Sequence, residues 1–196
     1  MLEKIALRLT TYMIEKEVIP ADDEEVYVYG WSLVFSQFGS LLLMILIAAL
    51  VGEFIGGVIF LAFTFPLRSY AGGFHASTYL RCFITSMSGF ASALLLALFW
   101  PERLMGWTLL LLVFSVLVTF IGAPVDHPNK PLKDHQKKRN KKLSRIIVST
   151  ETAVVLSLWF LLPVLRHYLF WGMLGMALTS LTLLYVLIRP YKEQLE

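Results

Sequence analysis

Long apolar runs are the feature that most limits what this chain can fold into. A helix that spans a bilayer needs about 20 mostly apolar residues. Charged, proline-rich or glycine-rich stretches separate six candidate runs, which cover residues 26–51, 54–66, 83–100, 104–123, 146–165 and 168–188. The second run is short, so we expect it to gain length from Gly52 and Glu53 or from the RSYAGG stretch that follows it. The sequence therefore predicts an all-α, polytopic membrane bundle of about six transmembrane helices, forming a single domain over residues 1–196.

The first 20 residues differ from these runs. Glu3, Lys4 and Arg8 interrupt the apolar stretch that a signal peptide would need. Apolar and charged side chains instead alternate near helical spacing, with Ile5, Leu9, Tyr12 and Met13 opposite Glu3, Arg8, Glu15 and Lys16. This pattern predicts an amphipathic helix over residues 1–20 that lies on the membrane surface, and an ordinary solvated helix is the other interpretation.

The distribution of basic residues indicates an orientation. With six crossings, both termini, the 68–82 segment and the 124–145 loop fall on one side of the membrane. Of the 17 lysines and arginines, only Arg103 and Arg166 fall on the other side. The positive-inside rule then predicts a cell-membrane protein with both termini cytoplasmic. The same rule accounts for the positive charge of the 124–145 loop, so nucleic-acid binding is not needed to explain it. The second interpretation is that this loop binds anionic lipid or an acidic peptide.

The residues from Arg68 to Cys82 form the densest polar stretch at membrane depth, and Cys82 is the only cysteine. A cysteine attacks a carbonyl carbon as the thiolate, so it needs a base or positive neighbours. The available candidates are His75, Arg68 and Arg81. With one cysteine the chain cannot form an intramolecular disulfide, so Cys82 is available as a thiol.

Spacing sets a condition on the pair formed by His75 and Cys82. In a straight helix the two residues would share a face but stand about 10.5 Å apart along the axis. A helical histidine would also lean toward the amino terminus, away from the thiol. Catalysis by the pair therefore predicts a break in the helix, for which the expected bend residues are Gly72, Gly73, Ser77 and Thr78.

A metal site and a role for Glu151 are the other possibilities that the sequence raises. His75 and Cys82 supply two ligands where a closed zinc site needs four, so we expect no metal and no cofactor. Glu151 is the one acidic residue well inside a predicted span. It could orient His75, pair with Arg145, or extend toward the membrane interface.

Two motifs in order resemble one known family. Arg68, Gly73, His75 and Cys82 follow two predicted spans, and the stretch APVDHPNKPL at 123–132 precedes a lysine-rich run and the fifth span. Together they look like the accessory gene regulator B (AgrB) family over most of the chain, from about Tyr27 to Arg189. The resemblance implies a membrane cysteine endopeptidase that processes the precursor of a quorum-sensing autoinducing peptide. Such an enzyme removes the carboxy-terminal tail of the precursor and helps to close a macrocycle.

The resemblance also implies roles for individual residues. Cys82 would be the nucleophile and His75 its proton-transfer partner, supported by Arg68, Gly72, Gly73 and Arg81. Residues of the second motif and the lysine-rich run after it would contact substrate: Pro124, Asp126, Asn129, Lys130, Lys133, Lys137, Lys138 and Arg139. The implied partners are a precursor with an amphipathic helix and an acidic tail, the lipid bilayer and a second copy of the chain in a homodimer. The alternative from another class is a non-enzymatic small membrane transporter or peptide exporter.

Overall fold

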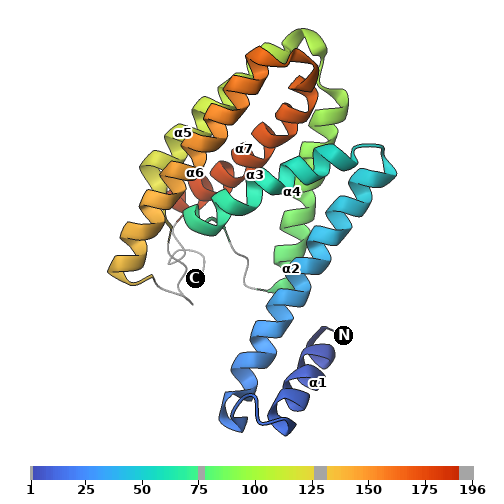
Figure 1. Ribbon diagram of the computed structural model, residues 1–196, viewed down its shortest axis with the longest axis vertical. Coiled ribbons are helices and arrows are strands. Elements are labelled where there is room, and N and C mark those ends of the chain that lie inside the picture. The colour runs from blue at the N-terminus through green and yellow to red at the C-terminus, as the bar shows by residue number, and fades with distance from the viewer. Residues whose placement is uncertain (1, 75–77, 126–131, 190–196) are drawn as a thin grey trace. The chain divides into compact units, whose positions relative to one another are not determined.

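The computed structural model describes residues 2–74, 78–125 and 132–189, and the regular elements in these residues are all helical (Figure 1). The long helices are α1 (Leu2–Glu15), α2 (Glu24–Leu50), α3 (Phe54–Ala71), α4 (Tyr79–Phe99), α5 (Leu109–Gly122), α6 (Asp134–Leu161) and α7 (Arg166–Ile188). Three short 3-10 helices connect them: η1 (Ala21–Asp23), η2 (Glu102–Thr108) and η3 (Pro163–Leu165).

The predicted fold class is confirmed. Among the described residues, six helical stretches are long and apolar enough to cross a membrane. The short second run does gain length, because α3 continues through Pro66 and includes the RSYA residues up to Ala71. The amino-terminal helix covers residues 2–15, and it buries Ala6 and Thr10 completely while Ile5 and Tyr12 are exposed.

The prediction of a loop over residues 124–145 needs a correction. Helix α6 begins at Asp134, so about three helical turns of this basic stretch lie in the helix itself. Lysine, arginine and glutamine are good helix formers, and neither proline nor glycine occurs between Asp134 and Arg145. Long apolar runs do not reveal these helical turns, because residues 134–145 are mostly polar.

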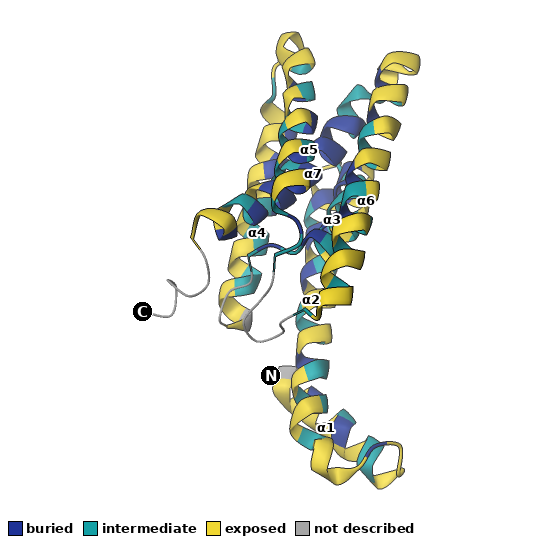
Figure 2. Cartoon of the chain, turned by 90° about the vertical axis from the view of Figure 1, so that its left-hand side faces the viewer, coloured by how far each residue is buried: buried dark blue, intermediate teal, exposed yellow. Residues whose placement is uncertain are grey.

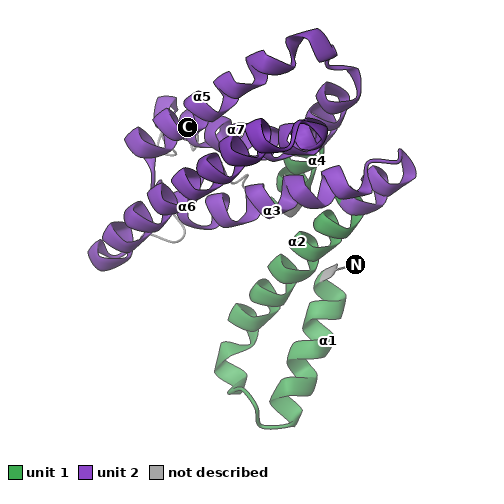
Figure 3. Ribbon diagram, turned by 45° about the horizontal axis from the view of Figure 1, so that its top comes forward, with its two compact units in different colours: residues 1–44, 76–87 green, residues 45–75, 88–196 purple. Residues whose placement is uncertain are grey.

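The described chain divides into two compact units (Figure 3). Unit 1 comprises residues 1–44 and 76–87, and unit 2 comprises residues 45–75 and 88–196. The single domain expected from the sequence stays a prediction.

Helices α3 and α7 pack side by side in unit 2, and α5 and α6 pack against them (Figure 1). Close approach depends on small residues of α7. A Cβ on Gly175 would lie 2.7 Å from the Phe60 carbonyl oxygen, and Gly172 faces the ring of Phe63. Trp171 is fully buried, with its ring against Phe60. Colouring by burial shows this core as the dark interior of the bundle (Figure 2).

Candidate functional site

The chain breaks its helical path directly before His75. Helix α3 ends at Ala71, and Gly72 and Gly73 follow with φ angles of +79° and +145°. Side chains disfavour these angles, so the two glycines are required by the backbone. Helix α4 begins only at Tyr79. The break that a pair of His75 and Cys82 would need is therefore present, and Thr78 stands in it as expected, while Ser77 lies outside the described residues.

Arg68 fixes this turn against α7. Its Nη2 donates to the carbonyl oxygen of Phe74 at 2.7 Å, and its Nη1 donates to Thr182 Oγ1 at 3.3 Å. Gly73 leaves room for this contact, since a Cβ there would lie 2.7 Å from Thr182 Oγ1. The Phe74 ring meets the edge of Tyr185 with centroids 5.3 Å apart. We call residues 68–74 the Arg68 turn; α7 holds it through Thr182 and Tyr185.

The start of the second motif packs onto the same turn. The backbone N–H of Val125 donates to the Ala71 carbonyl oxygen at 3.1 Å. A Cβ on Gly72 would come within 2.8 Å of the Val125 carbonyl oxygen. Pro124, joined to Ala123 by a cis peptide bond, immediately precedes this contact. The structure thus brings together the beginnings of two motifs that lie about 50 residues apart in the sequence.

Cys82 lies in the first turn of α4 and is partly buried. Thr78 caps this helix, because its Oγ1 accepts from the Arg81 N–H at 3.3 Å and its carbonyl accepts from the Cys82 N–H at 3.0 Å. Cys82 belongs to unit 1, whereas the Arg68 turn belongs to unit 2.

The remaining predicted site residues fall in two groups. The first group lies outside the described residues: His75, Asp126, Asn129 and Lys130. The second group is exposed at the beginning of α6 or directly before it: Lys133, Lys137, Lys138 and Arg139. Groups of three or more metal-ligating side chains are not found within the described ranges.

Glu151 faces the interior of unit 2. It lies on the helix face that carries Val148 and Val155, both fully buried. Arg145 does not pair with it, since Arg145 Nη2 donates to the Phe120 carbonyl oxygen at 2.8 Å. Within the described chain, Glu151 Oε2 is buried and has no hydrogen-bond partner. The pairing with Arg145 considered from the sequence is therefore wrong, and orientation of His75 stays a prediction.

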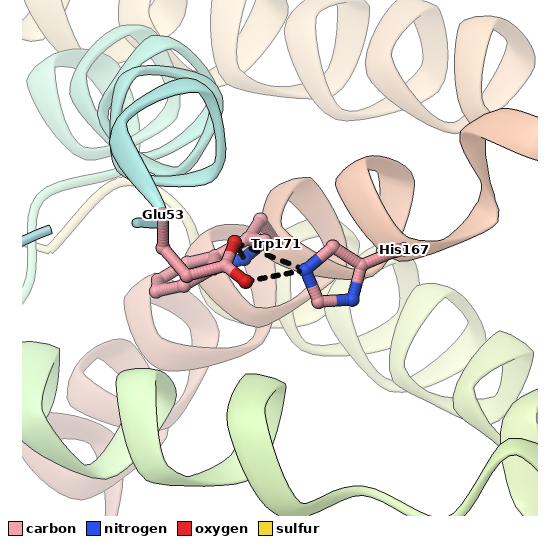
Figure 4. A network of polar contacts seen from close by, with 3 residues as sticks. All are labelled: Glu53, His167 and Trp171. Atoms are coloured by element: carbon pink, nitrogen blue, oxygen red, sulfur yellow. Dashed lines mark hydrogen bonds and ion pairs between the residues drawn. The ribbon is translucent and has the colours of Figure 1, made fainter. Parts of the chain in front are cut away.

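A second polar cluster, not predicted from the sequence, lies at the amino-terminal end of α3 (Figure 4). Glu53 precedes this helix, and both of its carboxylate oxygens lie 3.0 Å from His167 Nε2. The buried Trp171 Nε1–H donates to Glu53 Oε2 at 3.1 Å. Gly56 lies directly beneath the indole, where any Cβ would overlap it. Helix parity could have found the pair, since Glu53 and His167 adjoin predicted spans at the same side of the membrane.

Glu53→Ala is expected to destabilise the protein by about 1–3 kcal/mol, because it removes the acceptor of the buried indole N–H. For a chain of this size, the thermal midpoint should fall by roughly 3–10 °C. The midpoint can be followed by size-exclusion chromatography of heated, detergent-solubilised protein. Glu102→Ala removes an exposed carboxylate at η2 and serves as the control, with little change expected. An unchanged midpoint for Glu53→Ala would show that the cluster contributes nothing to stability.

Six helical stretches of the described chain are long and apolar enough to cross a bilayer, which defines a polytopic membrane protein. At the end of one of them, a turn brings two polar motifs together. Comparison with known families specifies this class. The profile of the family described as Accessory gene regulator B matches residues 6–183, and the chain belongs to this family. The family supports a role in the accessory gene regulator quorum-sensing system and is associated with peptide processing.

Two relatives come from Clostridium perfringens. An AgrB-like protein of strain SM101 is 27% identical over 181 residues, which cover 83% of this chain and 82% of the relative. AgrB-like protein 1 of strain 13 is 32% identical over 109 residues, covering 55% of this chain and 58% of the relative. No solved structure matches the chain significantly.

Proposed function

We propose that this chain is a membrane cysteine endopeptidase that removes the carboxy-terminal tail from a quorum-sensing peptide precursor and promotes macrocyclisation. The observation that carries the proposal is the break between Ala71 and Tyr79. A continuous helix would hold His75 and Cys82 about 10.5 Å apart, with the imidazole leaning away. The break removes this obstacle, and the chain belongs to a family associated with peptide processing.

The position of Cys82 suits a nucleophile. The amino-terminal end of a helix carries partial positive charge and favours an anion there. Cys82 lies in the first turn of α4, four residues after the Thr78 cap. We assign the proton transfer to His75, which follows the Arg68 turn in the sequence. Arg68, Gly72 and Gly73 act by positioning this segment.

The reaction follows from thiol chemistry. His75 takes the Cys82 proton, and the thiolate attacks the scissile carbonyl carbon of the precursor. His75 then protonates the leaving amine, the carbon–nitrogen bond breaks, and the released tail leaves a thioester on Cys82. A cysteine or serine side chain of the bound precursor attacks the thioester, which closes the ring and returns the thiol. Water attacking instead gives simple cleavage, so ring closure depends on a closely held internal nucleophile and exclusion of water.

Charged residues supply the other roles. Arg81, directly before Cys82, is the side-chain candidate for stabilising the oxyanion. Exposed positive charge for the acidic tail of the precursor comes from Lys133, Lys137, Lys138 and Arg139.

The distribution of basic residues supports a cytoplasmic location for the Arg68 turn, for the start of α6 and for both termini. Labelling of Cys82 by a membrane-impermeant maleimide only from the cytoplasmic side would agree, and labelling only from outside would overturn the orientation.

The test uses the full chain reconstituted in liposomes with a candidate precursor, chosen as a peptide of one amphipathic helix and an acidic tail whose short open reading frame is found beside the gene. Mass spectrometry should detect the released tail and, after acid quenching, an acyl adduct on Cys82 that hydroxylamine removes. Cleavage without such an adduct, under conditions that trap thioesters, would contradict the covalent mechanism. Uptake of intact peptide into the vesicles without cleavage would instead support the transporter alternative.

A further inference from the structure

Four of the basic residues in the amino-terminal part of α6 gather on one face of the helix. With about 100° of rotation per residue, Lys138, Lys141, Lys142 and Arg145 fall within about 100° of the helix circumference. Together with Ile146, these side chains line a hollow of about 390 Å³. We call it the basic hollow; it concentrates four positive charges on one face.

Arg145 places the basic hollow at the end of a membrane span. Its Nη2 donates to the Phe120 carbonyl oxygen at 2.8 Å, and its guanidinium lies over the Phe120 ring, 5.1 Å from the centroid. Phe120 belongs to the last turn of α5, which ends at Gly122. The Nε of Arg145 is buried and has no hydrogen-bond partner among the residues described. The basic hollow therefore lies where headgroups border the hydrocarbon.

A second hollow continues along α6 into the candidate span. It measures about 520 Å³ and is lined by Ser149, Thr150, Ala153, Val154, Ser157 and Leu158. Lys142, Ile146, Ser149, Ala153 and Ser157 follow the spacing of one helix face, which leads from the basic hollow to the second hollow. The other residues that line the two hollows lie on either side of this face. The small side chains of Ser149, Ala153 and Ser157 leave a shallow trough, and α6 is exposed along much of this side (Figure 2).

We propose that this side of α6 binds one anionic glycerophospholipid, with its headgroup phosphate in the basic hollow and one acyl chain along the trough. Lysine and arginine beside a span attract anionic headgroups, and the trough lies at the depth of the acyl chains. A free anion would use only the basic hollow. A diacyl lipid uses both hollows in the order in which they occur along the helix. This binding does not depend on the chemistry of Cys82, and the Cys82→Ala variant should retain it.

The experiment measures lipid retention by the full chain. Purified protein in detergent is mixed with equal amounts of phosphatidylglycerol and phosphatidylcholine and analysed by native mass spectrometry. We expect phosphatidylglycerol to be retained preferentially. The K141Q/K142Q variant should weaken its retention roughly tenfold or more, because two cations are lost from the headgroup site. The matched control K133Q/R139Q removes two cations that do not line the hollow, and its retention should stay near that of the unmodified chain.

A second variant tests the acyl-chain part. Ala153→Leu fills the trough with an apolar side chain that bilayer-facing positions tolerate, so folding should be preserved while retention of phosphatidylglycerol falls. Equal retention of the two lipids, or the same loss in K133Q/R139Q as in K141Q/K142Q, would overturn the proposal. Displacement of the lipid by inorganic phosphate at millimolar concentration would also overturn it, since it would identify a simple anion site.

Discussion

Cys82→Ala is expected to abolish cleavage of the precursor, lowering the rate by at least about 10³-fold, because no other thiol in the chain can form the thioester. The substitution is structurally mild, since alanine is the best helix former and Cys82 lies inside a helix. The measurement is the rate of tail release in liposomes that contain equal amounts of each protein.

Cys82→Ser provides the matched control for size. Its hydroxyl is a much weaker nucleophile than a thiolate, so the cleavage rate should also fall strongly although the side chain keeps its shape. Normal cleavage by Cys82→Ala would exclude Cys82 as the nucleophile and would direct attention to metal-dependent proteolysis.

Gly73→Ala is expected to reduce cleavage about 10²-fold while the protein still inserts and purifies. The new Cβ would lie 2.7 Å from Thr182 Oγ1, at a φ of +145° that side chains disfavour. The Arg68 turn must then shift, and displacement of a catalytic segment by about 1 Å can cost a factor of 10². The rate of tail release and the thermal midpoint should be measured together.

Gly39→Ala is the matched control, because Gly39 lies in α2 with open space around its hypothetical Cβ. It should leave the rate of tail release unchanged and the stability equal or higher. Full activity of Gly73→Ala at an unchanged midpoint would show that the Arg68 turn does not position the catalytic segment.

The spans could be predicted from the sequence because a bilayer imposes a length and a polarity on each of them. Residues 134–145 could not, since a polar helix outside a membrane leaves no apolar run. The break after Ala71 was predictable in kind, because the chemistry proposed for His75 and Cys82 requires it and adjacent glycines permit it. The sequence did not predict its exact bounds, which are the end of α3 at Ala71 and the start of α4 at Tyr79.

The contacts that hold the Arg68 turn and helix α3 in place could not be predicted from local sequence patterns. Arg68 meets Thr182, which is 114 residues away, and Glu53 meets His167 across the same distance in sequence. Such pairs are set by the packing of α3 on α7, which depends on glycines whose role in helix contact only the folded chain reveals. Of the candidate site, the sequence therefore predicted the turn, but not the neighbours that fix it, and the catalytic roles of His75 and Cys82 stay predictions.

Helix α3 is fastened to α7 at two points, by Glu53 at its beginning and by Arg68 near its end. Their separation of fifteen positions in the sequence corresponds to about 22 Å of helix. With both ends of α3 bound to α7, the helix cannot pivot about either end. Any displacement of the Arg68 turn during turnover must therefore slide α3 and α7 together or release one of the two fastenings.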